Sequence, residues 1–322
     1  MSRVLVTGAS GFIGRFLVDF LVDSGHFVTG VSRQGVHSSS DPIKRIQIDD
    51  LRQPQIWERI DFSNFDVVVH LAARAHVLRE PAREPISEFR AVNVIPSIAL
   101  FQACQRAGVP RFLLVSSIGV NGTMSVGIPF TELDSPNPLE PYAISKWEAE
   151  QALTRLSHEG CTALTIIRPA LVYGPHAKGN FHKLMGLIER GWPTPVASPD
   201  NRRNFLGVRN LCYLIELCMH HKNAIGETFL ASDLRAVTTR ELIVLLAHSM
   251  GRKARVIKIP RALLVAIGVL TGRRAEAVRL STSLEIDSFK ARSLLSWDND
   301  EDLPAGIGKM VGAFLHDRHV GR

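Results

Sequence analysis

The first half of the chain alternates between short apolar segments and longer segments whose apolar residues recur at helical spacing. The short segments have the length and composition of β-strands. They cover residues 3–7, 27–32, 44–48, 65–71, 112–116 and 163–167. Between the first two, a helix that ends near Gly25 is marked by Phe12, Ile13, Phe16, Leu17, Phe20 and Leu21. This alternation predicts an α/β fold, a doubly wound parallel sheet covered by helices on both faces.

A long helical segment follows the fourth predicted strand, from about residue 87 to residue 107, and Gly108 and Pro110 end it. After about Pro169 the alternation loosens, and turn residues such as Gly174 and Pro175 become frequent. We therefore expect one domain over residues 1–170. A smaller, mainly C-terminal region over residues 171–322 is expected to bind the substrate and to return some segments to the first domain.

Residues 262–270 form the most apolar run of the second half, ALLVAIGVL. The run is too short to span a bilayer, and Arg261, Arg273 and Arg274 flank it closely. We interpret it as a buried helix in preference to an interfacial contact with a membrane.

Composition and charge narrow the class of protein. The net charge is +7, but the basic residues are scattered and form no stripe with interleaved aromatics, which favours anionic small ligands over nucleic acid. The four cysteines show no CxxC spacing, so we expect free thiols and no metal site. Met1 runs directly into the first strand without a secretory signal, and we expect a cytoplasmic protein with no membrane span.

A glycine-rich turn joins the first strand to the first helix. Its glycines follow the spacing G-x-x-G-x-x-G, which allows a tight turn and close approach of the backbone to a pyrophosphate at the helix N-terminus. The position predicts a dinucleotide site in a Rossmann-like domain over residues 1–170. The residues assigned to the cofactor here are Gly8, Ser10, Gly11, Phe12, Ile13 and Gly14.

The end of the second strand bears on the choice of cofactor. Enzymes that prefer NAD have an acidic residue here, which binds the ribose 2′-hydroxyl, whereas this chain has Ser32 and Arg33. A 2′-phosphate can accept hydrogen bonds from both side chains. We therefore predict NADP, with NAD as the alternative. Asp50 and Leu51, just beyond the third strand, are expected near the adenine.

Tyr142 and Lys146 form a Y-x-x-x-K pair. On a helix, residues four apart share one face, so the ammonium lies beside the phenol. A positive charge favours the phenolate, and we expect a lowered Tyr142 pKa and a group that exchanges protons near neutral pH.

With this pair, the chain resembles the extended short-chain dehydrogenase/reductases of the epimerase/dehydratase branch. By register, the resemblance assigns to Ser117 the hydroxyl that binds the substrate oxygen, with Ser116 as the alternative. It also implies that several residues border the nicotinamide and its ribose, namely Leu71, Ala72, Ala73, Asn93, Tyr142, Lys146 and Pro169. His70 is interpreted as a strand-end histidine bonded to backbone rather than as a catalytic group. Leu171 departs from the pattern of the sugar epimerases, which have asparagine there.

Two further segments resemble the family's diphosphate-binding elements. Asn180 occupies the start of a helix that binds the diphosphate of a sugar nucleotide, and Arg203 occupies the position of an arginine that pairs with it. Asn204 replaces the usual aspartate. Arg279 is a candidate for a second diphosphate arginine.

The resemblance implies an oxidoreductase that acts on nucleotide sugars. It also implies a homodimer, because members of the family are commonly homodimers. We expect a reductase that delivers hydride to a keto carbon, C4 in particular, of a nucleoside-diphospho hexosulose, with a UDP-linked substrate from surface-polysaccharide synthesis. The main alternative is a UDP-sugar 4-epimerase. Two lesser alternatives are an enzyme that acts on a non-sugar ketone and a non-catalytic, NADP-sensing regulator.

Overall fold

Seven parallel strands form the central sheet of the computed structural model, in the order β11-β6-β5-β4-β1-β2-β3. The structure describes residues 1–33, 43–75, 84–196, 201–272, 277–278 and 281–320. The strands of the sheet are β1 (Arg3–Thr7), β2 (Phe27–Ser32), β3 (Lys44–Gln47), β4 (Val67–His70), β5 (Arg111–Val115), β6 (Ala163–Pro169) and β11 (Thr228–Ala231). The predicted doubly wound sheet is confirmed, and the order reverses between β1 and β4, where such sheets bind ligands.

Alternate residues of each strand face opposite layers of helices. Val4 and Val6 of β1 pack in one apolar cluster, and Leu5 packs in the other. The first layer contains α1 (Phe12–Asp23), α6 (Val208–His220) and α10 (Phe289–Leu295), and the second contains α3 (Ile95–Ala107) and α4 (Pro141–Ser157). A strand buried on both faces needs apolar residues at consecutive positions, which explains why β1 and β4 read as continuous apolar runs.

The helix expected over residues 87–107 is two helices, α2 (Pro85–Asn93) and α3. Pro96 lies in the first turn of α3 and has no N–H to donate to the preceding turn, so the ladder of hydrogen bonds is interrupted at Val94. The predicted end at Gly108 is confirmed: this residue is left-handed, and Val109 N donates to Cys104 O at 3.0 Å.

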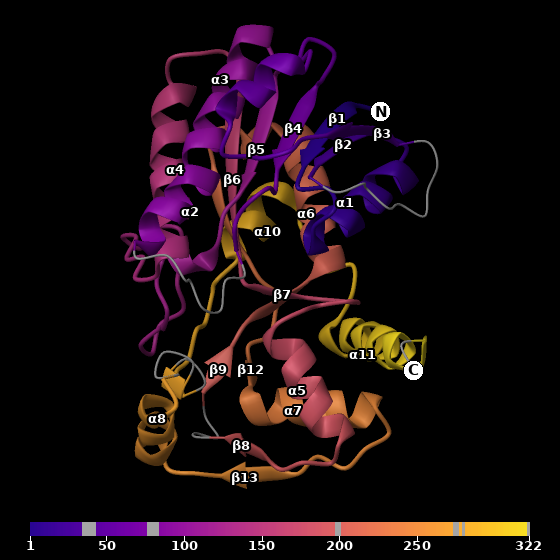
Figure 1. Ribbon diagram of the computed structural model, residues 1–322, viewed down its shortest axis with the longest axis vertical. Coiled ribbons are helices and arrows are strands. Elements are labelled where there is room, and N and C mark those ends of the chain that lie inside the picture. Colours follow the sequence, from indigo (N-terminus) through magenta and orange to yellow (C-terminus); the bar gives the residue numbers. More distant parts are fainter. Residues whose placement is uncertain (34–42, 76–83, 197–200, 273–276, 279–280, 321–322) are drawn as a thin grey trace.

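Below the sheet, in the view of Figure 1, lies a smaller region with a third apolar cluster. Its helices are α5 (Asn180–Glu189), α7 (Thr239–Ser249), α8 (Arg261–Leu270) and α11 (Leu303–Val320), of which α5, α7 and α11 contribute to that cluster. Three strand pairs accompany them: β7 (Leu171–Tyr173) with β10 (Phe205–Gly207), β9 (Arg202–Arg203) with β12 (Val237–Thr238), and β8 (Thr194–Val196) with β13 (Val256–Lys258). No helix among the described residues is both long enough and apolar enough to cross a membrane.

A buried ion pair joins α4 to the sheet. Arg168 at the end of β6 donates to Glu150 of α4 through two nitrogens, the shorter contact being 2.6 Å, and both side chains are almost fully buried. Ser116 Oγ, just past β5, also donates to Glu150, and Arg168 donates further to Asn121 Oδ1 at 2.9 Å. Every charged atom of the pair thus has a partner, as burial of two charges requires.

Removal of one charge of this pair is expected to destabilise the fold strongly. Arg168→Met leaves the Glu150 carboxylate buried without its counter-ion, and we expect a loss of about 3 to 5 kcal/mol in the free energy of unfolding, measured with urea. The double variant Arg168→Met/Glu150→Leu should recover much of this loss, since no unpaired charge remains. Arg90→Met, which breaks a solvent-accessible ion pair between α2 and Glu148 of α4, is the matched control and should change stability little. Equal effects of the two single variants would contradict the prediction.

Candidate active site

The glycine-rich turn leaves space that a side chain would fill. Gly8 has a φ of 73°, and a Cβ there would lie 2.8 Å from the backbone nitrogen of Ala72 at the end of β4. A Cβ on Gly14 would lie 2.2 Å from Gly8 O. The turn therefore packs directly against the segment after β4, as only glycine permits at these two positions.

Helix α1 begins at Phe12 without a capping side chain. Gly11 is its N-cap and has no side-chain oxygen, so N–H groups of the first helical turn have no side-chain acceptor. Ser10 and Ile13, the other residues assigned to the cofactor here, lie partly exposed beside it. An uncapped helix start behind a glycine turn fits the pyrophosphate of a dinucleotide.

The ends of β2 and β3 hold the residues that were assigned to the adenosine half. Ser32 is buried, and Arg33 is exposed at the strand's end. Asp50 accepts hydrogen bonds from the backbone and side chain of Arg52, which lowers the pKa of its carboxyl. Leu51 is buried below it. The carboxylate of Asp50 is thus already paired with a neighbouring cation.

The segment after β4 is fixed by a buried polar chain. His70 contacts Thr7 Oγ1 at 2.7 Å and Ser97 Oγ at 2.8 Å, and burial lowers the pKa of its imidazole to about 3. Both partners are side chains, so the prediction that His70 bonds to the backbone is wrong. Its interpretation as a structural residue rather than a catalytic one is unchanged. The neutral histidine thus connects β1, β4 and α3. It fixes the start of the segment that continues with Leu71, Ala72 and Ala73.

Asn93 links that segment to the helix of the tyrosine-lysine pair. Its Oδ1 accepts from Arg74 N at 2.8 Å, and its Nδ2 donates to Ser145 Oγ at 2.9 Å. Ser145 in turn donates to Tyr142 O at 2.7 Å. Asn93 is buried, and these contacts make it a positioning residue.

Tyr142 and Lys146 lie in the first turns of α4, and the tyrosine ring packs edge-on to Phe89 at 6.2 Å. Burial raises the pKa of Tyr142 to about 12 and lowers that of Lys146 to about 8, and the charge of Glu150 partly offsets the second shift. The expected lowering of the Tyr142 pKa by Lys146 is therefore wrong for the chain without cofactor. Loss of solvation outweighs the neighbouring charge, and the resting phenol is protonated.

Ser117 reaches the same place from the loop after β5. It caps a short 3₁₀ turn at Ile118–Val120, where Gly119 N donates to its Oγ at 3.1 Å. A Cβ on Gly119 would lie 3.3 Å from Ala143 Cβ and 3.4 Å from Ser117 Oγ, so the serine loop packs on α4 directly beside Tyr142. Ser116 is buried and bonded to Glu150 instead, which makes it a positioning residue and leaves Ser117 as the candidate that meets substrate.

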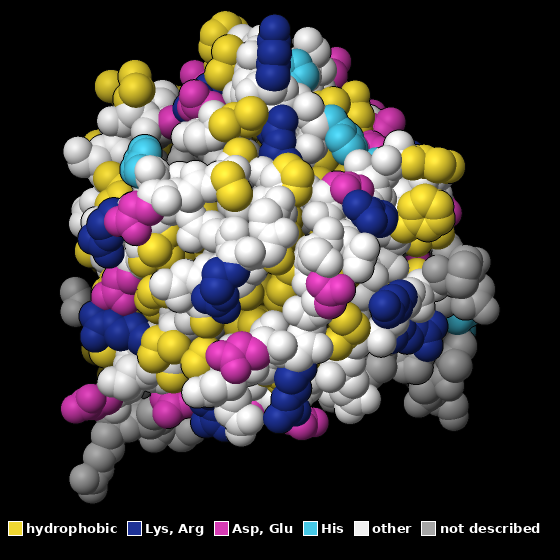
Figure 2. Space-filling view, turned by 90° about the horizontal axis from the view of Figure 1, so that it is seen from above, with side chains coloured by type: hydrophobic (Ala, Val, Ile, Leu, Met, Phe, Trp, Pro, Cys, Tyr) yellow, Lys and Arg dark blue, Asp and Glu magenta, His cyan; other side chains and the backbone are white. Residues whose placement is uncertain are grey.

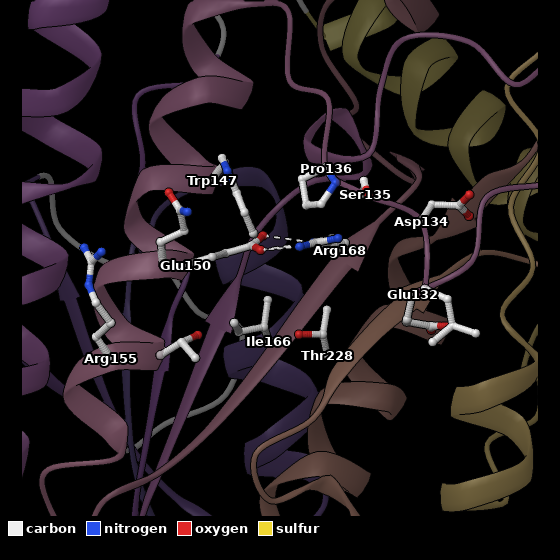
Figure 3. A pocket seen from close by; sticks show the side chains of 13 residues that line it. Glu132, Asp134, Ser135, Pro136, Trp147, Glu150, Arg155, Ile166, Arg168 and Thr228 are labelled. Atoms are coloured by element: carbon white, nitrogen blue, oxygen red, sulfur yellow. Dashed lines mark hydrogen bonds and ion pairs between the residues drawn. The ribbon is translucent and has the colours of Figure 1, made fainter.

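The sequence-based prediction did not identify the ion pair between Glu150 and Arg168, which lies next to this site. Figure 3 shows their ion pair on the wall of a pocket of about 560 Å³, which Trp147 and Thr228 also line. Tyr142, Lys146 and Ser117 do not line it, so this pocket is separate from the candidate catalytic residues. The spacing Lys146 to Glu150 is again four residues, a pattern that could have indicated the carboxylate.

The substrate candidates lie in the smaller region. Asn180 is the exposed first residue of α5, whose N-cap, Gly179, supplies no capping side chain. Arg203 of β9 is partly buried and donates to Thr282 O at 3.2 Å. Asn204 bridges Asp233 O and Ile286 N, so its amide has a structural task. Arg279 lies outside the described residues.

The carboxyl end of β6 completes the cluster. Pro169 is buried, and Leu171, at the start of β7, is 46% exposed. Just past β11, the strand that pairs with β6, Asp233 receives hydrogen bonds from Tyr173 Oη at 2.9 Å and Asn210 Nδ2 at 2.8 Å, and burial raises the pKa of its carboxyl. Because the strands are parallel, the glycine turn, the segment after β4, Ser117 and Pro169 all lie at one edge of the sheet.

Comparison with known proteins identifies relatives along nearly the whole chain. The model of the NAD dependent epimerase/dehydratase family matches residues 4–231. A UDP-glucose 4-epimerase of Vibrio cholerae is 34% identical over 97% of this chain and 95% of its own length. Another, of Mycolicibacterium smegmatis, is 35% identical over 97% and 98%. The crystal structure of the Thermotoga maritima UDP-glucose 4-epimerase with UDP-glucose has a TM-score of 0.81 at 26% identity, covering 98% of this chain and 99% of the other.

Lys146→Met tests the burial of the ammonium through the pH dependence of stability. The Lys146 pKa is about 8 in the folded chain and about 10.5 in the unfolded chain. Between these values the unfolded state binds more protons, so this residue makes the folded state more stable as pH rises. The variant lacks this contribution. From about pH 7 to about pH 9.5, the wild type should gain about 2 kcal/mol relative to the variant in urea unfolding of cofactor-free protein.

Lys222→Met, which removes an exposed lysine, is the control for this experiment and should follow the wild type. If Lys146→Met showed the same pH dependence as the wild type, the lysine would be solvated and the site open to water.

Proposed function

This chain belongs to the NAD dependent epimerase/dehydratase family and is an enzyme, and we propose that it is a 4-epimerase of UDP-linked hexoses. The observation that supports this most is the similarity to two UDP-glucose 4-epimerases over almost the entire chain. It extends through the region after residue 170, where the sugar nucleotide would be bound. The epimerase, the alternative at the level of sequence, is therefore preferred here to the 4-keto reductase.

The residues at the sheet edge fit a bound NAD. The cradle at Gly8 and Gly14 and the uncapped start of α1 would hold the pyrophosphate, and Lys146 would hold the nicotinamide ribose. When bound, NAD supplies the acceptor and donor of hydride, together with the positive charge of its oxidised ring.

Tyr142 would accept and return the proton of the reacting hydroxyl, and Ser117 would bind its oxygen. With NAD bound, Tyr142 would take the hydroxyl proton while the hydrogen on C4 leaves to the nicotinamide ring as hydride, so that the C4 alcohol becomes a ketone. Return of the same hydride to the opposite face of the ketone, with the proton given back by Tyr142, would give the epimer. Ser117 orients the oxygen, and Lys146 favours ionisation of Tyr142. Since burial alone holds the phenol protonated, the ionised form needs the additional positive charge of the loaded site.

The UDP moiety is assigned to the start of α5 and to Arg203. Asn180 and the free N–H groups behind it provide neutral donors, and the Arg203 guanidinium provides a bidentate cation for the diphosphate. Its hydrogen bond to Thr282 O orients this side chain in advance. Arg279 remains a candidate for a second cation.

The choice between NAD and NADP separates the two leading functions. An epimerase returns the hydride that it removed, so it retains its cofactor, whereas a reductase exchanges it at each turnover. The family match supports NAD, and the preference for NADP predicted from Ser32 and Arg33 stays a prediction.

The purified protein is expected to contain about one NAD per chain and to interconvert UDP-glucose and UDP-galactose, or their N-acetylated forms, without added cofactor. Nucleotide released by acid is identified by chromatography, and the epimers are separated in the same way. NADPH oxidised in proportion to a 4-keto sugar nucleotide, with no epimer formed, would reassign the protein as a reductase. In that case Arg33→Ala should weaken the binding of NADPH more than the binding of NADH.

Tyr142→Phe should reduce the turnover rate by about 10² to 10⁴, the usual contribution of a positioned acid or base. Binding of UDP-sugar should change little, because the ring remains. Ser117→Ala should cost less than Tyr142→Phe. Phe89→Leu, which removes the edge-on contact with the Tyr142 ring but keeps the phenol hydroxyl, is the control and should retain most activity. A Tyr142→Phe enzyme with wild-type turnover would show that another group moves the proton.

A further inference from the structure

Helix α8 is the apolar helix predicted from residues 262–270, but the expectation that it is buried is wrong. Of its ten residues only Gly268 is buried, and Leu270 is 85% exposed. Leu263, Ile267 and Leu270 recur at helical spacing along one exposed stripe, each at least 46% exposed. Figure 1 shows α8 at the lower end of the molecule beside β13, apart from α5 and α7. The described part of the chain thus leaves one face of α8 open to solvent.

Basic side chains gather directly before this helix. Between Leu242 and Gly272 the chain has five Lys and Arg residues and no Asp or Glu. They are Arg252, Lys253, Arg255, Lys258 and Arg261, and all are exposed. Within the described residues none of them forms an ion pair with an acidic side chain. By contrast, Figure 2 views the opposite end of the molecule, where basic and acidic side chains are interspersed.

Two more exposed apolar side chains lie next to these charges. Trp192, 59% exposed, precedes β8, and Ile257 is half exposed on β13, which pairs with β8. Arg255 ties the two segments together, since its side chain donates to Gly191 O at 3.2 Å and Thr194 N donates to its backbone oxygen at 2.8 Å. We call the surface formed by Trp192, residues 252–258 and α8 the α8 surface.

We propose that the α8 surface docks on the surface of an anionic phospholipid bilayer, with α8 lying in the interface. Ten helical residues span about 15 Å, roughly half of the hydrocarbon core, so the helix is suited to lie in the interface rather than to cross. Apolar side chains on an open helix face enter the headgroup boundary, and flanking Lys and Arg bind anionic headgroups. Tryptophan is enriched at the same depth.

Charge argues against a second copy of the chain as the occupant. A twofold interface would place the same patch on both subunits, so the five cations of each copy would face those of the other without acidic partners. A bilayer that contains phosphatidylglycerol supplies the complementary charge. Docking would hold the smaller region against the membrane.

The test is cosedimentation of the full chain with extruded vesicles at low ionic strength. The wild type should bind vesicles of mixed phosphatidylglycerol and phosphatidylcholine, and should bind phosphatidylcholine alone much more weakly. Ile267→Ser/Leu270→Ser should reduce partitioning by about tenfold or more. Arg252→Gln/Lys253→Gln changes only exposed side chains, and should reduce it about fivefold for each charge.

Matched controls come from the sheet end of the molecule. Ile225→Ser removes an isoleucine that is 49% exposed, against 46% for Ile267. Arg106→Gln/Arg155→Gln removes the same number of exposed charges from α3 and α4. Both should bind like the wild type.

Two results would overturn the proposal. The first is vesicle binding that the α8 variants and the controls reduce equally. The second is no vesicle binding by the wild type, together with self-association in analytical ultracentrifugation that Ile267→Ser/Leu270→Ser abolishes, which would assign the surface to a second copy.

Discussion

The buried ion pair between Arg168 and Glu150 is the contact on which the geometry of the candidate site depends. It joins the end of β6 to α4, and through Ser116 it includes the loop after β5. Two charges in the interior are tolerable only when each remaining polar atom also has a partner, which Ser116 and Asn121 provide. The constraint sets the distance of α4 from the sheet, and so the place of Tyr142, two turns before Glu150, and of Lys146, one turn before it.

Burial has a second consequence for the same helix. Tyr142 and Lys146 both lose water, and each then favours its neutral form: the phenol stays protonated, and the ammonium releases its proton more easily. Glu150, one turn from Lys146, opposes the second shift. A site prepared in this way requires a further positive charge before it can take a proton from a hydroxyl. An oxidised nicotinamide ring would bring such a charge, and under the proposed function it would couple ionisation of Tyr142 to binding of the cofactor.

The two ends of the molecule differ in how they meet their surroundings. At the sheet end, helices cover both faces, and charges of both signs are mixed over the surface (Figure 2). At the other end, α8 has an apolar stripe exposed to solvent, next to cations on β13 and the segment before it that have no acidic partner within the described residues. The buried apolar cluster of the smaller region consists of α5, α7 and α11 with the short strands, and α8 is not part of it.

Local sequence determined the backbone of this protein. Apolar periodicity located the strands and the ends of α1 and α3, because side-chain spacing and glycine conformations act within a few residues. The glycine turn and the Y-x-x-x-K pair were equally local. The division of the helical pattern at Pro96 was local as well, because the missing N–H acts within one turn. Tertiary structure decided the rest. Arg168 met Glu150 from a different element. Burial reversed the expected Tyr142 pKa shift, and α8 formed as predicted but stayed exposed. Burial and pairing depend on residues distant in the chain, and the spacing of one segment contains no information on what will cover it.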